Sequence, residues 1–279
     1  MDVKTCLITG ATSGIGLETC IGLAQKKINL IIISRCEKKL SDLARQLVNK
    51  YNIQVRTYVC DLSSIKKTKN IVDIILNDFD RIDIIINNVG AIFMERQINN
   101  EGIEITFALN HLSYFALTTR LLDGLKNIDN MRIINVSSNA HKSISLDFNN
   151  LENLDNYNGW HAYKRSKLAN IYFTYYLAAT IKNKSVSVNC LHPGVVNTNF
   201  ANNTKNIFYK FMANIIKLFG LSSKEGAETS IYLASDELTS HITGQYFYKC
   251  RPIKSSENSY DHQLGKRLWH LSEKIVNEI

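Results

Sequence analysis

The chain has 279 residues, within the range of one α/β domain, and 45% of them are hydrophobic and 21% charged. These ordinary values, without any biased tract, exclude disordered, collagen-like and repeat proteins. The net charge is +8, which would suit an anionic partner, but the basic residues are scattered and form no stripe with aromatic residues between them. We therefore expect one domain over residues 1–279 and no nucleic-acid partner.

Cysteines and histidines show no metal-binding or redox pattern. The six cysteines include no CxxC pair, and the seven histidines have no metal-ligand spacing. We expect a reducing, cytoplasmic compartment and no metal. Strand-like sequence begins at Val3, and no apolar run approaches the ~20 residues of a membrane span, so neither a signal peptide nor a transmembrane segment is predicted.

Short β-branched runs alternate with helical patterns along the chain. The expected strands cover 3–9, 29–34, 53–59, 82–87, 131–137 and 186–192. The expected helices between them cover 15–24, 39–51, 65–76, 102–125 and 162–181. Strands that are apolar almost throughout are typical of a parallel sheet covered on both faces. The sequence therefore predicts an α/β fold with an open, doubly wound parallel sheet of Rossmann type.

A glycine-rich loop, TGATSGIG over 9–16, follows the first predicted strand and opens a helix. Glycines let the backbone approach a pyrophosphate, and the N–H groups of the helix start supply donors. The alternative is a glycine-rich connection without a ligand. We favour dinucleotide binding, and assign it to Gly10, Ser13, Gly14, Ile15 and Gly16.

The end of the second predicted strand bears on the choice of cofactor. An acidic residue is usual there for binding the adenosine ribose, but this chain has Ser34 and Arg35. A carboxylate would repel a 2′-phosphate, whereas a guanidinium attracts it. We therefore expect NADP(H) rather than NAD(H), the alternative being that Arg35 is only a solvated charge.

The ends of two further predicted strands give weaker indications of a cofactor site. Asp61 and Leu62 follow the third predicted strand, and Asn88 and Gly90 follow the fourth. Ligands of open α/β sheets bind at the carboxyl ends of strands. We therefore place these four residues at the cofactor site.

The segment 163–167, YKRSK, lies in the last predicted helix. Tyr163 and Lys167 share one helix face, and a nearby ammonium is expected to lower the pKa of the phenol, making it a proton donor and acceptor. Ser138 follows the fifth strand and could hold a substrate oxygen, and Asn110 could order a water chain to Lys167. A Tyr and a Lys four residues apart also occur by chance, so this pattern gains weight only beside the glycine loop.

Taken together, these segments resemble the short-chain dehydrogenase/reductase family, in its single-domain branch. The similarity covers nearly the whole chain. It rests on TGATSGIG (9–16), DL (61–62), NNVG (87–90), NH (110–111), NVSS (135–138), YKRSK (163–167) and HPGVVNT (192–198), all in the family's order. One departure is Val89, where the family commonly has alanine.

The resemblance implies a role for each site residue. It places the family's catalytic tetrad on Asn110, Ser138, Tyr163 and Lys167, with Ser138 preferred to Ser137. In the family the tyrosine transfers the proton, the lysine also binds the nicotinamide ribose, the serine polarises the carbonyl and the asparagine maintains the proton relay. Further nicotinamide contacts fall on Pro193, Gly194, Val196 and Thr198.

Within this family the chain is similar to retinol dehydrogenase-like members. The features shared with them are NVSSNAH, HPGVVNT, a long gap between Ser138 and Tyr163, and the ending RLWHLS over 267–272. Those enzymes interconvert retinoids and other long apolar alcohols and aldehydes, often with NADP(H) and often from a membrane anchor. No such anchor is predicted here.

The segment IFYKFMANIIKLFGL, 207–221, is amphipathic at helical spacing. It lies where the family carries its substrate lid, so we expect a mobile cover, over roughly 199–222, on an apolar pocket. A core-facing helix and a membrane-interface helix are the alternatives, the latter allowing peripheral membrane contact. Residues 250–279 are expected to form a C-terminal tail.

We therefore expect an NADP(H)-dependent enzyme that interconverts a carbonyl and an alcohol on a small lipophilic substrate such as a retinoid, steroid or fatty aldehyde. The alternative is a catalytically silent NADP(H)-binding regulatory protein, against which the intact tetrad argues. Members of the family usually form homodimers through the helices that here include 107–125 and 162–181, but monomeric members exist. The sequence determines neither the oligomeric state nor the direction of the reaction.

Overall fold

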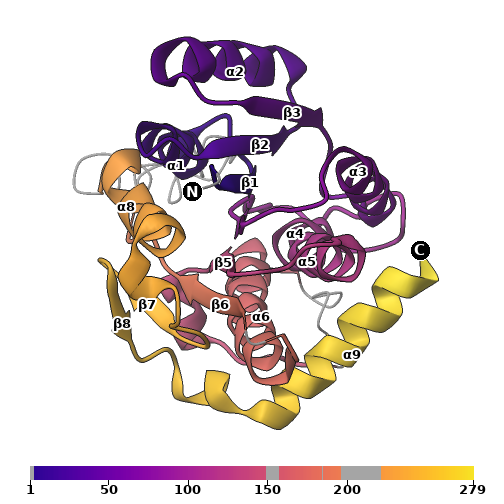
Figure 1. Ribbon diagram of the computed structural model, residues 1–279. Helices are drawn as coiled ribbons and strands as arrows, with labels where there is room; N and C mark the ends of the chain where they lie inside the picture. The colour runs from indigo at the N-terminus through magenta and orange to yellow at the C-terminus, as the bar shows by residue number, and fades with distance from the viewer. Residues whose placement is uncertain (1–2, 149–156, 184, 196–220) are drawn as a thin grey trace.

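The structure is a computed structural model that describes residues 3–148, 157–183, 185–195 and 221–279. Eight strands in these ranges form one sheet in the order β3-β2-β1-β4-β5-β6-β7-β8. All neighbouring strands are parallel except β7 and β8. The predicted α/β Rossmann-type sheet is therefore confirmed (Figure 1).

The six predicted strands are present, each within two residues of its expected bounds. They are β1 (Thr5–Thr9), β2 (Asn29–Ser34), β3 (Val55–Val59), β4 (Ile84–Asn87), β5 (Met131–Val136) and β6 (Val186–Leu191). Two further strands, β7 (Tyr246–Tyr248) and β8 (Arg251–Ile253), were not predicted from the sequence because each has only three residues. Pro252 is accommodated because β8 is the edge strand, where a missing N–H donor costs little.

The predicted helices are present, with one interruption. They are α1 (Gly14–Gln25), α2 (Glu37–Tyr51), α3 (Ile65–Asp78) and α6 (Gly159–Thr180). The helix predicted over 102–125 consists of α4 (Ile105–Phe107), a π-helical turn η1 (Ala108–Leu112) and α5 (Ser113–Gly124). Two further helices, α8 (Ser223–Ser235) and α9 (His262–Glu278), were not predicted from the sequence.

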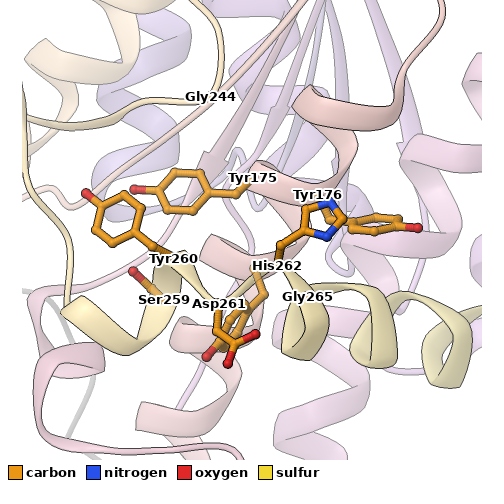
Figure 2. A pocket seen from close by; sticks show the side chains of 9 residues that line it. Tyr175, Tyr176, Gly244, Ser259, Tyr260, Asp261, His262 and Gly265 are labelled. Carbon is orange, nitrogen blue, oxygen red and sulfur yellow. The ribbon is translucent and has the colours of Figure 1, made fainter.

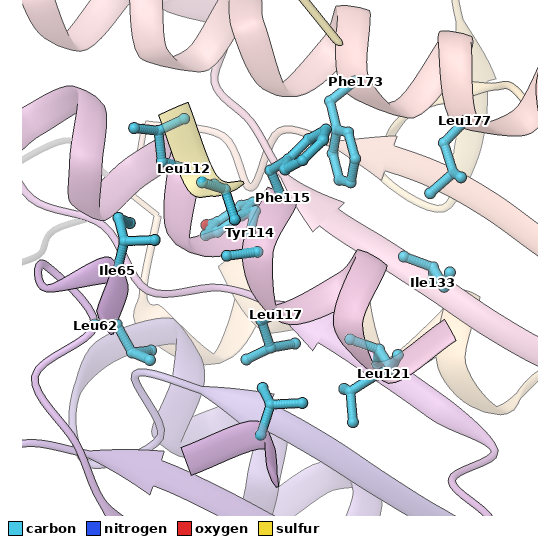
Figure 3. Close-up of a cluster of buried hydrophobic side chains, with 14 of the residues drawn as sticks. Leu62, Ile65, Leu112, Tyr114, Phe115, Leu117, Leu121, Ile133, Phe173 and Leu177 are labelled. Carbon is cyan, nitrogen blue, oxygen red and sulfur yellow. The ribbon is translucent and has the colours of Figure 1, made fainter. Parts of the chain in front are cut away.

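Helices cover both faces of the sheet, and each face has its own hydrophobic core. On one face the cluster joins side chains of α1, α2 and α8 to alternate strand residues such as Ile8 and Ile32. On the other face α3, α5, α6 and α9 pack over the intervening strand residues, among them Leu7 and Ile133 (Figure 3). Burial on both faces explains why the strands are apolar almost throughout.

The strand order reverses between β1 and β4, which are adjacent in the sheet although α1, β2, α2, β3 and α3 separate them along the chain. Consecutive connections therefore leave β1 and β4 in opposite directions, and ligands of open α/β sheets bind at the carboxyl ends of strands at such a switch point. The glycine loop follows β1, and Asn88 and Gly90 follow β4. The fold thus brings these predicted cofactor segments together.

The C-terminal helix α9 packs against α5 and α6 (Figure 1). The Trp269 ring lies 4.8 Å from that of Phe115 and 5.9 Å from that of Phe173. Because α9 covers part of α5 and α6, the homodimer contact expected through these helices would have to lie outside that covered area.

Most of the predicted lid, including the amphipathic segment 207–221, lies outside the described residues. Its two flanks are described and meet, since the Leu221 N–H donates to the Val195 carbonyl over 2.8 Å. Within the described ranges, the helices are too short or too polar for any of them to span a membrane.

A row of buried amides and hydroxyls links β4 and β5 to the helices above them. The Asn87 carboxamide donates to Thr118 Oγ1 and to Asn135 Oδ1, each over 2.8 Å. Asn135 in turn donates to Thr174 Oγ1 over 2.9 Å. All four residues are fully buried, so each hydrogen bond satisfies a group that water cannot reach.

We predict that Asn135→Ala lowers the free energy of unfolding by about 2–3 kcal/mol, because it deprives Asn87 of its acceptor and Thr174 of its donor while leaving a small cavity. Urea denaturation measures the loss. The exposed Asn77 in α3 offers a matched control, and Asn77→Ala should change stability by less than about 0.5 kcal/mol. Equal effects of the two substitutions would contradict the structural role of the row.

Candidate active site

The glycine loop is held closely against the end of β4. Gly10 has φ +69°, and a β-carbon there would lie 3.0 Å from Val89 Cα. A β-carbon on Gly16 would lie 2.2 Å from the Gly10 carbonyl oxygen and 2.6 Å from Asn88 Nδ2. The Asn88 carboxamide also donates to the Thr9 carbonyl over 2.8 Å. The structure therefore uses the Asn88 side chain to brace the loop.

The first turn of α1 is suited to a phosphate. Gly14 begins the helix with φ +54°, and the exposed Ser13 at the N-cap makes no side-chain capping bond. The first turn contains no acidic residue. The N–H groups of this turn that have no partner within the helix, together with the positive end of the helix dipole, fit the pyrophosphate of a dinucleotide.

The predicted adenosine side of the site is formed by the ends of β2 and β3. The Ser34 hydroxyl lies 2.8 Å from that of Thr12, which ties the end of β2 to the glycine loop. Arg35 is exposed and makes no hydrogen bond or ion pair with another described residue. Asp61 Oδ1 accepts from the Ser63 N–H and hydroxyl. Leu62 is part of the core.

Helix α6 begins against the loop that follows β4, and this contact positions Tyr163. A β-carbon on Gly159 would lie 2.1 Å from the Phe93 carbonyl oxygen, so only glycine permits this approach. Tyr163 is 8% exposed, and its hydroxyl is hydrogen-bonded to Ser138. The Trp160 ring stacks on the Tyr163 ring at 5.5 Å.

Lys167 lies one turn further along α6 and is buried. Its ammonium donates to the Val136 carbonyl over 2.9 Å and lies 5.8 Å from the centre of the Tyr163 ring. A β-carbon on Gly90 would come within 3.2 Å of this nitrogen. The Ser137 hydroxyl donates to the Lys167 carbonyl over 2.7 Å. Ser137 is thus occupied in holding α6, whereas Ser138 faces the tyrosine.

The expectation that Lys167 lowers the pKa of Tyr163 is wrong for the chain by itself. Burial raises the pKa of Tyr163 to about 12, and the hydrogen bond from Ser138 opposes this only in part. Burial also lowers the pKa of Lys167 to about 7. Desolvation outweighs attraction here because a partly neutral amine in a dry site offers little positive charge to a phenolate.

Asn110 lies in the π-helical turn η1, directly beside Gly90 and Lys167. Its carboxamide exchanges two hydrogen bonds of 2.9 Å with the backbone of Ala91 and also donates to Ser166 Oγ. A β-carbon on Gly90 would lie 3.4 Å from Asn110 Oδ1 and 3.2 Å from the lysine nitrogen. A π-turn inside a helix is frequent at functional sites.

The predicted nicotinamide contacts after β6 are described only in part. Pro193 and Gly194 lie beyond the end of β6, and Gly194 has φ +90°. Its N–H donates to His192 Nδ1 over 3.2 Å. Val196 and Thr198 lie outside the described residues.

Two buried histidines near the site were not singled out from the sequence. His141 Nδ1 lies 2.7 Å from the Ser138 carbonyl, and His111 Nδ1 lies 3.2 Å from Asn170 Oδ1. His111 and His141 belong to the segments NH and NVSSNAH, which the sequence comparison with the family already used. They were not singled out because a lone histidine in an apolar segment is more often a core residue than a ligand. Their partners lie more than fifty residues away in several cases, which no local pattern shows.

A separate cavity of about 150 Å³ lies between α6 and the start of α9 (Figure 2). It is lined by aromatic residues, among them Tyr172, Tyr175 and Tyr260. Tyr172 is nine residues beyond Tyr163, which is roughly 14 Å along the helix. This cavity is therefore distinct from the catalytic end of α6.

Comparison with known proteins identifies the class to which this fold and site belong. The sequence model described as short chain dehydrogenase matches residues 4–206. The chain belongs to the short-chain dehydrogenase/reductase family, and it is an oxidoreductase-family protein of the retinol dehydrogenase-like type. Proteins of this family bind nicotinamide cofactors.

Individual relatives match over nearly the full chain. Retinol dehydrogenase 14 of Homo sapiens is 34% identical over 292 residues, which cover 99% of this chain and 87% of that protein. The short-chain dehydrogenase TIC 32 A, chloroplastic, of Brassica napus is 32% identical, with 100% and 91% covered. The crystal structure of an uncharacterized protein from Mycobacterium Paratuberculosis superposes with a TM-score of 0.79 at 27% identity, covering 98% of this chain and 93% of that one.

The buried ammonium of Lys167 should make stability depend on pH. Its pKa falls from 10.5 to about 7 on folding, so between these values the unfolded chain binds more protons and stability rises with pH. Lys167→Met removes this dependence. We expect the variant to be more stable than the wild type at pH 6, and this advantage to shrink by about 2–3 kcal/mol by pH 9.

Urea denaturation of both proteins at the two pH values measures this change. Lys39→Met, an exposed lysine in α2, controls for the substitution itself. An advantage of Lys167→Met that stayed constant from pH 6 to pH 9 would show that the lysine is not desolvated.

Proposed function

We propose that the chain is an NADP(H)-dependent oxidoreductase that interconverts a carbonyl and an alcohol on a lipophilic substrate, with residues 1–279 acting as one catalytic domain. The observation that carries the proposal is the hydrogen bond between the Tyr163 hydroxyl and Ser138, beside the buried Lys167. The family assignment supports it, because the chain carries the residues of the family's tetrad.

The residues for the cofactor are those of the glycine loop and the strand ends. The first turn of α1 would hold the pyrophosphate, Ser34 and the exposed Arg35 the 2′-phosphate of the adenosine ribose, and Lys167 the nicotinamide ribose. Asp61 and Leu62 after β3, and Asn88 and Gly90 after β4, would line the cofactor site, while Pro193, Gly194, Val196 and Thr198 would contact the nicotinamide. The cofactor, when bound, supplies or accepts the hydride.

Tyr163 and Ser138 handle the substrate oxygen. In the reductive direction the carbonyl carbon gains the hydride, and its oxygen takes the proton from the Tyr163 hydroxyl, giving the alcohol. Burial keeps this hydroxyl protonated near neutral pH, because its pKa is about 12. Ser138 would donate a hydrogen bond to the same oxygen and stabilise the developing charge. The phenol is therefore protonated and can act as the proton donor in the reductive direction.

The surroundings of Tyr163 support an apolar substrate. Trp160, stacked on the tyrosine, is 39% exposed. Exposed apolar side chains next to a catalytic group provide contact area for a hydrophobic ligand. Relatives named retinol dehydrogenase agree with such a substrate.

Tyr163→Phe should abolish turnover. We expect the rate of NADPH oxidation with all-trans-retinal, a medium-chain aldehyde or a steroid ketone to fall at least about 100-fold, because the proton donor is lost while the ring remains. The control is Tyr176→Phe, further along α6 beside the separate cavity, which should retain wild-type turnover. A wild type that binds NADPH but reduces none of the three carbonyls would favour the silent binding protein instead.

Arg35→Ala should weaken NADPH binding about 10-fold or more and leave NADH binding nearly unchanged, since only NADPH carries the 2′-phosphate that the guanidinium would bind. Isothermal titration with both cofactors tests this. Arg45→Ala in α2 removes the same charge from another exposed site and should have little effect. Tighter binding of NADH than of NADPH by the wild type would overturn the cofactor assignment.

A further inference from the structure

The C-terminal segment 255–279 reaches the catalytic residues through two chains of hydrogen bonds. One runs from Ser272 in α9 through His111 and Asn170 to the backbone carbonyl of Asn110. The other runs from the backbone of Ser256 through His141 to the backbone carbonyl of Ser138. Each chain passes through one histidine whose side chain is fully buried.

The chemistry of the partners determines the direction of the first chain. Asn110 O can only accept, so Asn170 Nδ2 donates to it over 2.9 Å and Asn170 Oδ1 faces His111. His111 Nδ1 must then carry the proton and donate. His111 Nε2, 3.0 Å from Ser272 Oγ, is left to accept from that hydroxyl.

The second chain has the same polarity. The Ser138 carbonyl can only accept, so His141 Nδ1 donates to it over 2.7 Å. The Ser256 N–H can only donate, so His141 Nε2 accepts over 2.9 Å. The His141 ring is therefore neutral, since protonation of its Nε2 would set two donors against each other. The Ser272 hydroxyl could accept as well as donate, but burial lowers the pKa of His111 to about 4, so this ring is also neutral and has the same tautomer.

We propose that His111 and His141 are positioning residues through which the C-terminal segment holds Asn110 and Ser138 in their catalytic geometry. This rests on the proposed oxidoreductase function. Ser138 is also the N-cap of the short 3-10 helix η2 (Asn139–Ser143). A hydrogen bond to its carbonyl can therefore orient the main chain at the start of this helix. Asn110 lies in the π-helical turn, where the regular α-helical hydrogen-bond pattern is interrupted.

The packing of α9 agrees with this role. Its buried positions, Gly265, Leu268, Ser272 and Val276, follow one face of the helix, and Ser272 is the polar side chain on that face. Trp269 packs on Phe115 and Phe173 next to the histidine. The apolar contacts that hold α9 in place therefore also position the Ser272 hydroxyl beside His111. The ending RLWHLS, 267–272, contains both Trp269, which packs on Phe115 and Phe173, and Ser272, which lies beside His111.

The test compares turnover with cofactor binding. We expect His111→Phe and His141→Phe, which keep a buried ring, to lower the single-turnover rate of carbonyl reduction by about 10-fold or more, because small displacements of catalytic groups are costly. The dissociation constant of NADPH should change by less than about threefold, since the glycine loop and Arg35 lie elsewhere. His141→Asn, whose amide can replace Nδ1 as the donor to Ser138, should recover most of the rate.

A second comparison separates positioning from simple packing. Ser272→Ala should slow reduction in the wild-type background and have no added effect in His111→Phe, because both break the same chain. Lys69→Met serves as the control: Lys69 donates to the Val276 carbonyl of α9 over 3.1 Å but contacts neither histidine. It should leave the rate within about twofold. Equal losses from Lys69→Met and Ser272→Ala, or rate and NADPH affinity falling together, would overturn the proposal.

A third measurement distinguishes failure of this inference from failure of the proposed function. If the wild type reduces no carbonyl, the oxidoreductase proposal fails, and the ring nitrogens of the two histidines still report on the hydrogen-bond chains. Their ¹⁵N resonances should show neutral rings protonated at Nδ1, with only His111 altered in Ser272→Ala. Rings protonated at Nε2, or no response of His111 to Ser272→Ala, would refute the two chains themselves.

Discussion

The burial of the Lys167 ammonium is the constraint on which the site depends. An amine in this position loses its hydration and gains one carbonyl, that of Val136, together with the faces of Tyr114 and Tyr163. Its lowered pKa records the cost. Burial of a charge without a carboxylate partner is unfavourable, and such groups occur mainly where function requires them.

The surroundings of Lys167 follow from this requirement. Gly90 must lack a side chain, because a β-carbon would approach both the lysine and Asn110. Ser137 holds the lysine backbone, so that the next residue, Ser138, is free to face Tyr163. The close approach of Gly159 to Phe93 sets the start of α6 and hence the position of the tyrosine. Each of these residues limits where the amine and the phenol can lie relative to each other.

The same site is supported from three parts of the chain that are distant in sequence. The row of buried amides below it ties β4 and β5 to α5 and α6. Asn88 ties the glycine loop to the end of β4. The C-terminal helix closes the outer face of α5 and α6. A retinol dehydrogenase-like chain thus uses its last helix as part of the core that surrounds the catalytic end of α6.

The sequence by itself determined the six main strands and the glycine loop, because β-branched runs and glycines after a strand are local patterns. It indicated the tetrad positions through the resemblance to the family, together with the spacing that puts Tyr163 and Lys167 on one helix face. It did not determine the pKa of Tyr163, since the balance between burial and the lysine charge depends on residues from several elements. It did not predict α8 or α9, and it missed β7 and β8 because three-residue strands carry no periodicity.

Only the tertiary structure showed that the Asn88 amide braces the loop and that Asn110 lies in a π-turn. It also brought His111 to Ser272 and His141 to Ser256, pairs separated by 161 and 115 residues. Local sequence reports the conformation of neighbouring residues. Hydrogen bonds between distant segments arise only when hydrophobic burial has packed the helices on the sheet, so their partners cannot be read from spacing.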